Sequence, residues 1–484
     1  MKRVLALLLL LAICLSSVLL FSSCGKKKKG SANGNNLFSS EGLLLVERND
    51  KYGYIDKTGK EVIPCKYYYA TEFINGYAVT QEKKDDSYYY IKPDGTRLSE
   101  TPYYRAGSFD NQGRALVLKS ENGKPQLIDK DGKTIFSAKS IYSGQNGQYL
   151  FKDDSDLWGV VDKNGKVLLS ARYDDLDFVY TINSAEDYYN DEETVLTDRL
   201  IAQRKSSSGT TYYLIDLKGN ELYTAQKGYS IYPGCVNGTF VSISPDEGEG
   251  KEQYNAAFTL FNRAGKEIAT VEGEMEIYGF SSVGLLVMFY KNYKESDDTY
   301  YKVIDWSGNV LIDFKDKEYD AEDDGFWWNG EMIFEANEKP WKSGVMNAKT
   351  GEIMIPMEYD YLSYDGFDGN GLLIGQKEED GAFVVLNRKG ATVFSIECDD
   401  LDILSYKSPY YCAEYEQGDN ISCELLDTKG NTVHSFGTRF RPRAYYDDGF
   451  IVCRVYEDGE PAGYTIFNSK FEQVSTTIYD SIGY

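Results

Sequence analysis

The sequence is poor in the residues that most enzymes use for acid-base and metal chemistry. His434 is the only histidine among 484 residues, so a Ser-His-Asp or Cys-His arrangement would have a single candidate base. That histidine follows a turn in LLDTKGNTVHSF, where we expect an ordinary strand residue. The chain has no His-Glu-x-x-His motif, no Walker loop and no Gly-x-Gly-x-x-Gly opening a helix. These absences favour a protein that is not an enzyme, although glycosidases need only two carboxylates and stay open.

The spacings of cysteine and acidic residues that are typical of metal sites are also missing. No Cys-x-x-Cys pair occurs, so cysteine spacing predicts no metal site, and disulfides among the remaining cysteines cannot be assigned. The segment Asp129-Lys-Asp131-Gly132 places carboxylates in a tight loop, but the EF-hand series with its distal glutamate is absent. Capping of a turn explains each such aspartate without calcium. We therefore predict no metal and no cofactor.

Long apolar runs are absent except at the N-terminus. Residues 1–23 have the three parts of a signal peptide: Lys2 and Arg3, an apolar run from Val4 to Leu20, and small residues before Cys24. The segment LFSSCG resembles the bacterial lipobox, which implies cleavage before Cys24 and lipidation of its thiol. An uncleaved membrane anchor is the alternative, since about 17 apolar residues are borderline for spanning a bilayer.

Charge divides the remaining chain into two parts. Lys26, Lys27, Lys28 and Lys29 form a basic cluster that would add to the lipid's attraction for an anionic membrane surface. Residues 24–40 are thus expected to be a lipid-anchored, basic and polar tether. The body beyond it is acidic, because the whole chain has 76 acidic against 52 basic residues. Such a body is repelled by nucleic acid, and we expect an extracytoplasmic, lipid-anchored protein of the bacterial cell envelope.

One pattern recurs along residues 41–484. A short apolar segment ends in Asp or Asn, two variable residues and a glycine follow, and a second apolar segment begins. Asp or Asn starts a turn by accepting backbone N–H groups, and the glycine supplies the left-handed conformation that closes a type I turn with a bulge. Each motif therefore predicts a β-hairpin. The copies include GYIDKTGKEVIP, LIDKDGKTIF, GVVDKNGKVLL, YLIDLKGNELY, KVIDWSGNVLI, VVLNRKGATVF and LLDTKGNTVHSF, and a degenerate copy, TIFNSKFEQVS, lacks the glycine.

The repeat spacing predicts the fold class. The turn glycines recur at steps near forty residues, and a strand meander of that length is typical of a β-propeller blade. We predict an all-β protein of about ten or eleven meander units, most simply one large propeller or two smaller ones, with an open β-solenoid as the alternative. An acidic insert places the one candidate domain boundary within residues 174–200.

The residues in these repeats resemble a known family. Trp158-Gly159-Val-Val-Asp162-Lys-Asn-Gly165 is similar to the WG-repeat family of bacterial proteins, named for its Trp-Gly dipeptide. Tyr52-Gly53 and Trp341-Lys-Ser-Gly344 are imperfect copies. The resemblance implies an exported all-β repeat array, and the family has no established catalytic activity and supplies no ligand.

Aromatic residues give the only lead to a binding site. The chain has 42 tyrosines, and we expect most of them to pack between repeats. Aligning Gly330 with Gly76 puts Trp327 at a packing position and Trp328 in a connecting turn, where we expect an exposed side chain. An exposed tryptophan can anchor a partner, so Trp328 is our candidate binding residue.

The function favoured by these features is a non-enzymatic binding or scaffolding module that engages an envelope protein or a cell-wall polymer. A carbohydrate-binding or carbohydrate-active protein is one alternative, and a structural envelope spacer is another.

Overall fold

The computed structural model describes residues 36–143, 147–182, 184, 194–247, 254–290, 299–418 and 420–483. The signal peptide, Cys24 and the lysine cluster at residues 26–29 lie outside these residues. The described chain is built from strands that pair antiparallel except where Tyr180 and Thr181 pair parallel with Gly234 and Cys235, and its elements include no α-helix. Across the same residues, no helix is long and apolar enough to cross a membrane. The prediction of an all-β fold made of repeated small antiparallel sheets is confirmed.

The recurring Asp-x-x-Gly motif forms the predicted turn. In the first copy, Gly59 N donates to Asp56 O at 2.9 Å and Asp56 N donates to Lys60 O at 2.9 Å. Asp56 Oδ1 accepts the backbone N–H of Thr58 at 2.8 Å and that of Lys60 at 3.1 Å. Gly59 has φ +79°, the left-handed region that glycine enters without a side-chain clash. The sequence motif thus encodes both the reversal and its closing hydrogen bonds.

Another recurring glycine precedes the turn motif, at the glycine position of the Trp-Gly dipeptide. Close packing of two strands requires it. A Cβ on Gly53 would lie 2.6 Å from Ile63 O, and one on Gly344 would lie 2.7 Å from Ile355 O. In both places the outer strand of the hairpin shifts register opposite the glycine. The carbonyl of the bulged strand therefore occupies the space that any side chain would need.

The described residues fall into two compact units. The middle unit is residues 168–397, and the end unit combines 36–167 with 398–483. The chain enters the middle unit within β14 (Val167–Tyr173). Residues 174–200, where the sequence favours a boundary, contribute β15 (Asp175–Thr181) and β16 (Thr194–Ser206), which pair with each other in the middle unit.

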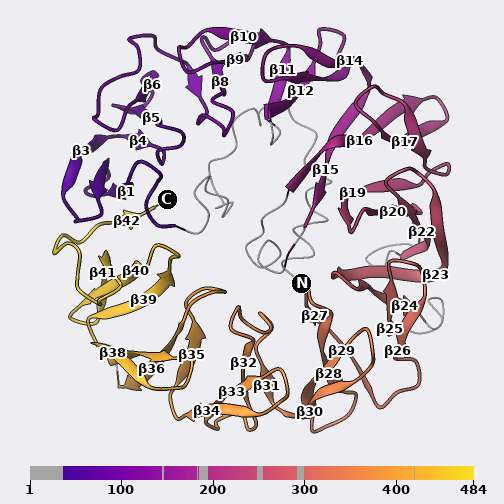
Figure 1. The fold of residues 1–484 in the computed structure, drawn as a ribbon, viewed down its shortest axis with the longest axis vertical. Coiled ribbons are helices and arrows are strands. Elements are labelled where there is room, and N and C mark those ends of the chain that lie inside the picture. Colours follow the sequence, from indigo (N-terminus) through magenta and orange to yellow (C-terminus); the bar gives the residue numbers. More distant parts are fainter. Residues whose placement is uncertain are drawn as a thin grey trace. The chain divides into compact units, whose positions relative to one another are not determined.

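The end unit consists of sheets of three or four strands (Figure 1). Their orders are β3-β2-β1-β42, β4-β5-β6, β10-β9-β8-β7, β35-β36-β37-β38 and β39-β40-β41, with β11, β12 and β13 adjacent in a further sheet. The strands are β1 (Leu43–Glu47), β2 (Tyr52–Asp56), β3 (Glu61–Tyr67), β4 (Tyr69–Ala70), β5 (Ala78–Gln81), β6 (Tyr88–Ile91), β7 (Arg105–Ala106), β8 (Ala115–Leu118), β9 (Gln126–Ile128), β10 (Thr134–Ser137), β11 (Ser140–Ser143), β12 (Gln148–Lys152), β13 (Trp158–Asp162), β35 (Asp400–Ile403), β36 (Tyr410–Gln417), β37 (Asn420–Asp427), β38 (Thr432–Gly437), β39 (Phe440–Tyr445), β40 (Ile451–Glu457), β41 (Glu460–Phe467) and β42 (Ser481–Ile482).

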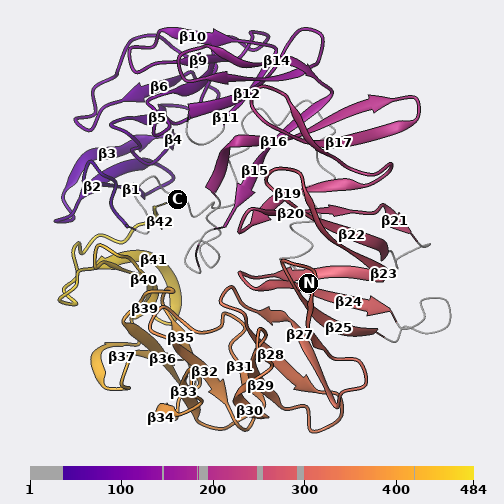
Figure 2. The same ribbon diagram turned by 45° about the vertical axis from the view of Figure 1, so that its right-hand side comes forward.

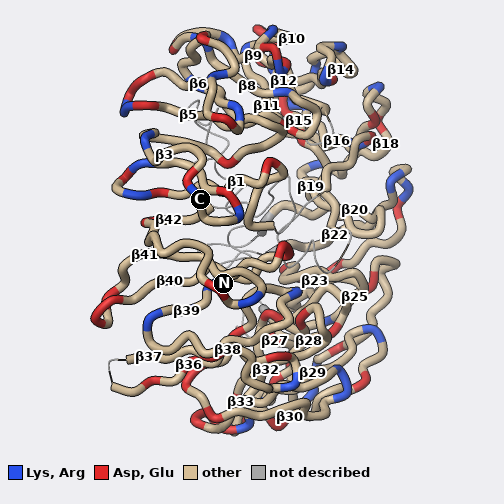
Figure 3. Tube along the Cα trace, turned by 60° about the vertical axis from the view of Figure 1, so that its left-hand side comes forward, with Lys and Arg blue, Asp and Glu red and all other residues tan. Residues whose placement is uncertain are grey.

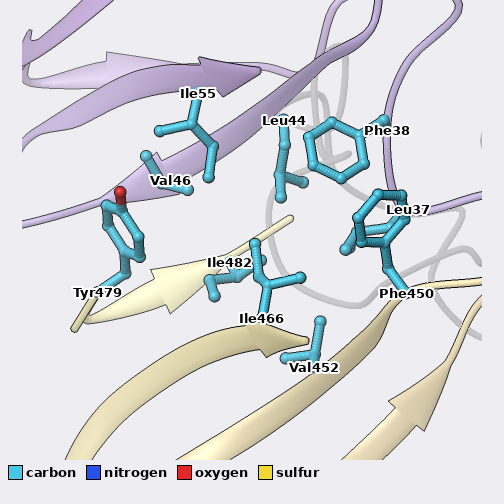
Figure 4. Close-up of a cluster of buried hydrophobic side chains, with 10 residues drawn as sticks. All are labelled: Leu37, Phe38, Leu44, Val46, Ile55, Phe450, Val452, Ile466, Tyr479 and Ile482. Carbon is cyan, nitrogen blue, oxygen red and sulfur yellow. The ribbon is translucent and has the colours of Figure 1, made fainter. Parts of the chain in front are cut away.

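The two distant parts of the end unit are joined by a shared sheet. β42, near the C-terminus, pairs antiparallel with β1, with Val46 opposite Ile482. Figure 4 shows the apolar side chains of both parts pointing toward one another between the strands. The core there comprises Leu37, Phe38, Leu44, Val46, Ile55, Phe450, Val452, Ile466, Tyr479 and Ile482. The first repeat is thus completed by the last residues of the chain.

The middle unit has two four-stranded sheets, β27-β28-β29-β30 and β31-β32-β33-β34, beside a twelve-stranded sheet (Figure 2). The larger sheet joins three meanders at two places. β15 pairs parallel with β19, and β23, which is 14 residues long, pairs with both β22 and β24. The twelve-stranded sheet contains β15 to β26. Besides β15 and β16, its strands are β17 (Gly209–Ile215), β18 (Glu221–Thr224), β19 (Ser230–Val236), β20 (Thr239–Ile243), β21 (Asp246–Glu247), β22 (Tyr254–Asn262), β23 (Glu267–Phe280), β24 (Gly284–Tyr290), β25 (Thr299–Asp305) and β26 (Val310–Asp313). The strands of the two four-stranded sheets are β27 (Tyr319–Phe326), β28 (Glu331–Ala336), β29 (Ser343–Asn347), β30 (Ile353–Tyr359), β31 (Tyr361–Leu362), β32 (Leu372–Gln376), β33 (Phe383–Asn387) and β34 (Thr392–Ile396).

Candidate functional site: exposed aromatic residues of the middle unit

The side chain of Trp328 is buried, so the exposure expected from the sequence is wrong. Only 5% of the residue is accessible. Ser282 covers this turn from the preceding meander, where its backbone N–H and hydroxyl both donate to Trp328 O, at 2.9 and 2.7 Å. Repeat alignment places a residue in a turn but does not show which neighbouring segment covers that turn.

Trp327 is also buried, as its alignment with a packing position predicts. Its indole Nε1 donates to Tyr364 O at 3.0 Å, and its ring meets the edge of Phe367 at 5.8 Å. The bond ties the turn before β28 to the segment after β31. Trp327 therefore fixes the backbone of Tyr364, whose own side chain is exposed.

The exposed tryptophan is instead Trp341, which is 57% accessible. It lies between β28 and β29, in the imperfect Trp-Gly copy of the sequence. In the literal copy, Trp158 is inside strand β13 and packs on Tyr142 at 5.1 Å. Two extra residues separate Trp341 from Gly344, so the indole lies in the loop before the strand begins. Lys339 Nζ lies 4.7 Å from the centre of the indole ring.

Contacts to the next meander hold this loop in place. Lys342 Nζ pairs with Asp360 Oδ1 at 2.8 Å and donates to Lys377 O at 2.5 Å. Trp341 and Tyr361 are the chain neighbours of the two paired residues. Tyr361 is 39% accessible and Tyr364 is 52% accessible. We call Trp341, Tyr361 and Tyr364 the aromatic face; its backbone is fixed by the Lys342 and Trp327 contacts.

Several other tyrosines of the described residues are buried between strands. Tyr54 is fully buried and its hydroxyl donates to Thr71 O at 2.7 Å. Tyr90, in the next meander, makes the equivalent bond to Gly107 O at 2.7 Å. In both cases the acceptor is 17 residues further along the chain. Burial raises the pKa of both phenols well above the ordinary value, so these hydroxyls are neutral structural donors.

A polar depression of about 390 Å³ lies in the end unit, between the turns that follow β7 and β9. Arg114 Nε donates to Lys163 O at 2.6 Å, Lys163 Nζ donates to Gln112 Oε1 at 2.8 Å, and Asn75 Nδ2 donates to Asp110 O at 2.7 Å. Turns of successive meanders are thus cross-linked around it. Basic and acidic positions both occur at the turns of this unit (Figure 3). The depression is lined by Asn111, Gln112, Gly113, Arg114, Asp129, Lys130 and Asp131.

Asp129, which lines this depression, and Asp110, next to its lining, act as turn caps. Asp129 Oδ1 accepts the backbone N–H of Asp131 at 3.0 Å and that of Lys133 at 2.9 Å. Asp110 Oδ1 caps its own turn in the same way, and the hydroxyl of Tyr149 donates to its other oxygen. The carboxylates are therefore engaged in their own loops, which accounts for their recurrence in the sequence.

The lone histidine lies in strand β38. Its ring stacks on Phe471 at 4.9 Å and meets the edge of Phe436 at 4.6 Å. Burial lowers the pKa of His434 below its ordinary value. The ring therefore stays neutral at physiological pH and serves as part of the packing between β38 and the last turn.

Three potential metal ligands come together where the sequence predicts no metal site. The ligand atoms of Cys412, Glu414 and Cys423 all lie within 4.8 Å of one another. Strands β36 and β37 form a hairpin in which Glu414 is directly opposite Cys423. The spacing of cysteines along the chain does not indicate this cluster, because its members meet across a hairpin. Counting the register outward from the Gly418 turn would have brought them together.

Comparison with solved structures finds β-propellers. BamB from Moraxella catarrhalis is 9% identical, with a TM-score of 0.24, over 65% of this chain and 93% of that one. The β-propeller domain of the Trilobed protease from Pyrococcus furiosus is 12% identical, with a TM-score of 0.25, over 76% of this chain and 94% of that one. No curated protein matches the chain. Residues 52–84 and 158–180 match the family model described as WG containing repeat. These two segments, which hold Tyr52-Gly53 and Trp158-Gly159, are therefore similar to the WG containing repeat.

Proposed function

We propose that this protein is a non-enzymatic binding module of the bacterial cell envelope, and that the aromatic face contacts its partner. The observation that carries the proposal is the exposure of Trp341 on a loop fixed by the Lys342 contacts. Tryptophan and tyrosine supply large contact areas with few side-chain torsions to restrain, which is why they dominate binding hot spots. A spacer without a partner would not require an indole that is 57% accessible on a loop held by two contacts.

The proposed location rests on the N-terminal sequence. Lipidation of Cys24 and the four lysines at 26–29 would give two anchoring signals, which stable attachment to a membrane requires. The acidic body would then face away from the anionic membrane surface. An extracytoplasmic position brings the aromatic face within reach of envelope proteins and cell-wall polymers.

A carbohydrate partner is favoured by one specific feature. Exposed aromatic rings provide flat apolar surfaces, and Tyr361 and Tyr364 add hydroxyl groups at their ends. Sugar rings offer the complementary combination of an apolar face and a hydroxyl edge. A cell-wall polysaccharide is therefore the second, more specific candidate.

The test is retention of envelope components by the full chain, purified in detergent and immobilised. The inputs are cell-wall polysaccharides, peptidoglycan and detergent extracts of membrane proteins. The informative variant is Trp341→Ala, and Val310→Ala is the matched control because Val310 is a 50% exposed apolar residue of the same unit. Saturable retention that Trp341→Ala reduces and Val310→Ala preserves supports the proposal. Retention that both variants preserve contradicts the role given to the aromatic face.

A further inference from the structure

A cluster of sulfur and oxygen ligands lies between two sheets of the end unit, far in sequence from the aromatic face. Cys412 and Glu414 share one face of β36, because residues two apart in a strand point the same way. Cys423 lies opposite Glu414 on β37, with its Sγ 3.8 Å from Glu414 Oε1. Cys453, on β40, belongs to the same buried cluster as both cysteines.

The separations match those of a metal centre. Zn–S and Zn–O bonds are about 2.3 and 2.0 Å long, so tetrahedral ligand atoms lie about 3.5 to 3.8 Å apart. The distance of 3.8 Å from Cys423 Sγ to Glu414 Oε1 is within about 0.3 Å of the sulfur–oxygen separation of about 3.5 Å, and the whole set lies within 4.8 Å. Small rotations of the Cys412 and Cys423 side chains would be enough to enclose an ion.

The summed charge of the side chains in this cluster favours a divalent cation. Two thiolates and one carboxylate carry three negative charges. Arg443 on β39, which interacts electrostatically with Glu414 and Cys423, supplies one positive charge, because a guanidinium stays protonated in proteins. A divalent cation would leave this set neutral, whereas a monovalent soft ion such as Cu⁺ would leave a negative charge in a buried place. Mixed sulfur and carboxylate ligation is also within the range that zinc accepts.

We propose that Cys412, Glu414 and Cys423 bind a zinc-type divalent cation. On binding, the two thiol protons leave to solvent and two Zn–S bonds form, so each ion taken up at Cys412 and Cys423 releases two protons. No electron transfer is involved. The ion would link β36 and β37.

Two simpler accounts of the cluster explain less. Buried cysteines often serve as small apolar residues, but that role gives no reason for a carboxylate 3.8 Å from a thiol. A disulfide between Cys412 and Cys423 would join diagonal neighbours, since Cys412 is directly opposite Leu425. Such neighbours are about 7 to 8 Å apart at Cα, beyond the usual disulfide span.

The experiment uses the full chain, purified in detergent, reduced, and freed of metal with a chelator. Zinc is added, excess ion is removed, and bound zinc is measured by elemental analysis; Co²⁺ is used in parallel because its absorption spectrum reports tetrahedral thiolate ligation. The informative variants are Cys423→Ser and Glu414→Gln. Cys65→Ser and Cys398→Ser are matched controls, because both cysteines are half-buried and lie outside the cluster. Circular dichroism checks the fold of each variant.

We expect one zinc per chain in the unmodified protein and in both controls, with tetrahedral cobalt bands. Cys423→Ser should lose the ion, and Glu414→Gln should bind it at least about 10-fold more weakly. Glu414→Gln removes a charge without opening a cavity, so it remains informative if Cys423→Ser fails to fold. Failure of the reduced protein to retain zinc would overturn the proposal. So would equal affinity in Glu414→Gln and Cys65→Ser, or a native Cys412–Cys423 disulfide whose reduced form takes up no zinc.

Discussion

Gly265 lies against the backbone of Leu222: a Cβ placed on this glycine would be 1.9 Å from the Leu222 carbonyl oxygen. Gly265 closes the turn between β22 and β23, with φ +81°. The edge of β18 thus occupies the space beside this turn, and two meanders of the middle unit meet without an intervening side chain.

This contact predicts unequal effects of the same substitution at two turn glycines. Gly351 also has a left-handed φ, +71°, but a Cβ there meets nothing within 4 Å. Gly351→Ala should therefore cost about 1 kcal/mol of unfolding free energy from backbone strain alone. Gly265→Ala must in addition displace backbone, and should cost several times as much. Chemical denaturation measures both, and equal costs would show that the two meanders separate easily at this point.

The turn aspartates predict an acid-dependent stability. Hydrogen bonds from the Asn431 side chain and from backbone amides hold the pKa of Asp427 below its ordinary value of 3.8. Because the folded-state pKa is the lower one, this stabilisation is complete above about pH 4 and is lost as the pH falls through the folded-state pKa.

Asp427→Asn should keep the cap and remove the acid dependence, since Asn387 and Asn468 cap equivalent turns. We expect a change within about 0.5 kcal/mol at pH 7, against a loss of about 1 to 2 kcal/mol for Asp427→Ala. Urea denaturation at pH 7 and pH 3 distinguishes them. A larger loss at neutral pH in the Asn variant than in the Ala variant would contradict the capping role.

The buried carboxylate of Glu331 predicts that the stability of the folded chain depends strongly on its ion-pair partner, Arg388. This carboxylate is 7% accessible and forms an ion pair with Arg388, whose guanidinium lies 4.6 Å from the centre of the Phe367 ring. Arg388→Met leaves a buried charge unpaired and should cost about 3 kcal/mol. The double variant with Glu331→Met should recover most of that loss, because both charges are gone. A double-mutant cycle that shows no recovery would mean that the cost is due to lost packing on Phe367.

The pairing of β42 with β1 predicts that the last residues stabilise the first repeat. Ile482 is buried in the cluster that joins these strands (Figure 4), so Ile482→Ala should cost about 2 to 5 kcal/mol. Val433→Ala is the control, because Val433 is an exposed valine of the same unit and its truncation should change stability by less than about 0.5 kcal/mol. Hydrogen exchange should localise the loss to β1 and β2. A uniform loss across the end unit would contradict the specific closure.

The sequence predicts those parts of the fold that short segments encode. The Asp-x-x-Gly turns, the hairpins and the all-β repeat follow from residues within a dozen positions of each other, and even the degenerate last copy keeps its turn. There Phe471 adopts φ +61° in place of the glycine and stacks on His434. A left-handed phenylalanine costs conformational energy, and the ring contact offsets part of it.

The candidate sites depend on contacts between repeats, which local sequence does not encode. Trp328 is covered by Ser282, a residue 46 positions earlier, and Trp341 is exposed because two inserted residues place it outside its strand. The Cys412 and Cys423 cluster depends on hairpin register and on the packing of the next sheet. In each case the residue types were visible in the sequence and their surroundings were not.

The most direct test of the proposed function is the affinity of the full chain for the envelope component it retains, measured by titration for the unmodified protein, Trp341→Ala and Val310→Ala. Hot-spot tryptophans contribute at least about 2 kcal/mol, which corresponds to a loss of about 30-fold in affinity. We predict that loss for Trp341→Ala and an unchanged affinity for Val310→Ala. Equal affinities for all three proteins would contradict the assignment of the aromatic face as the binding surface.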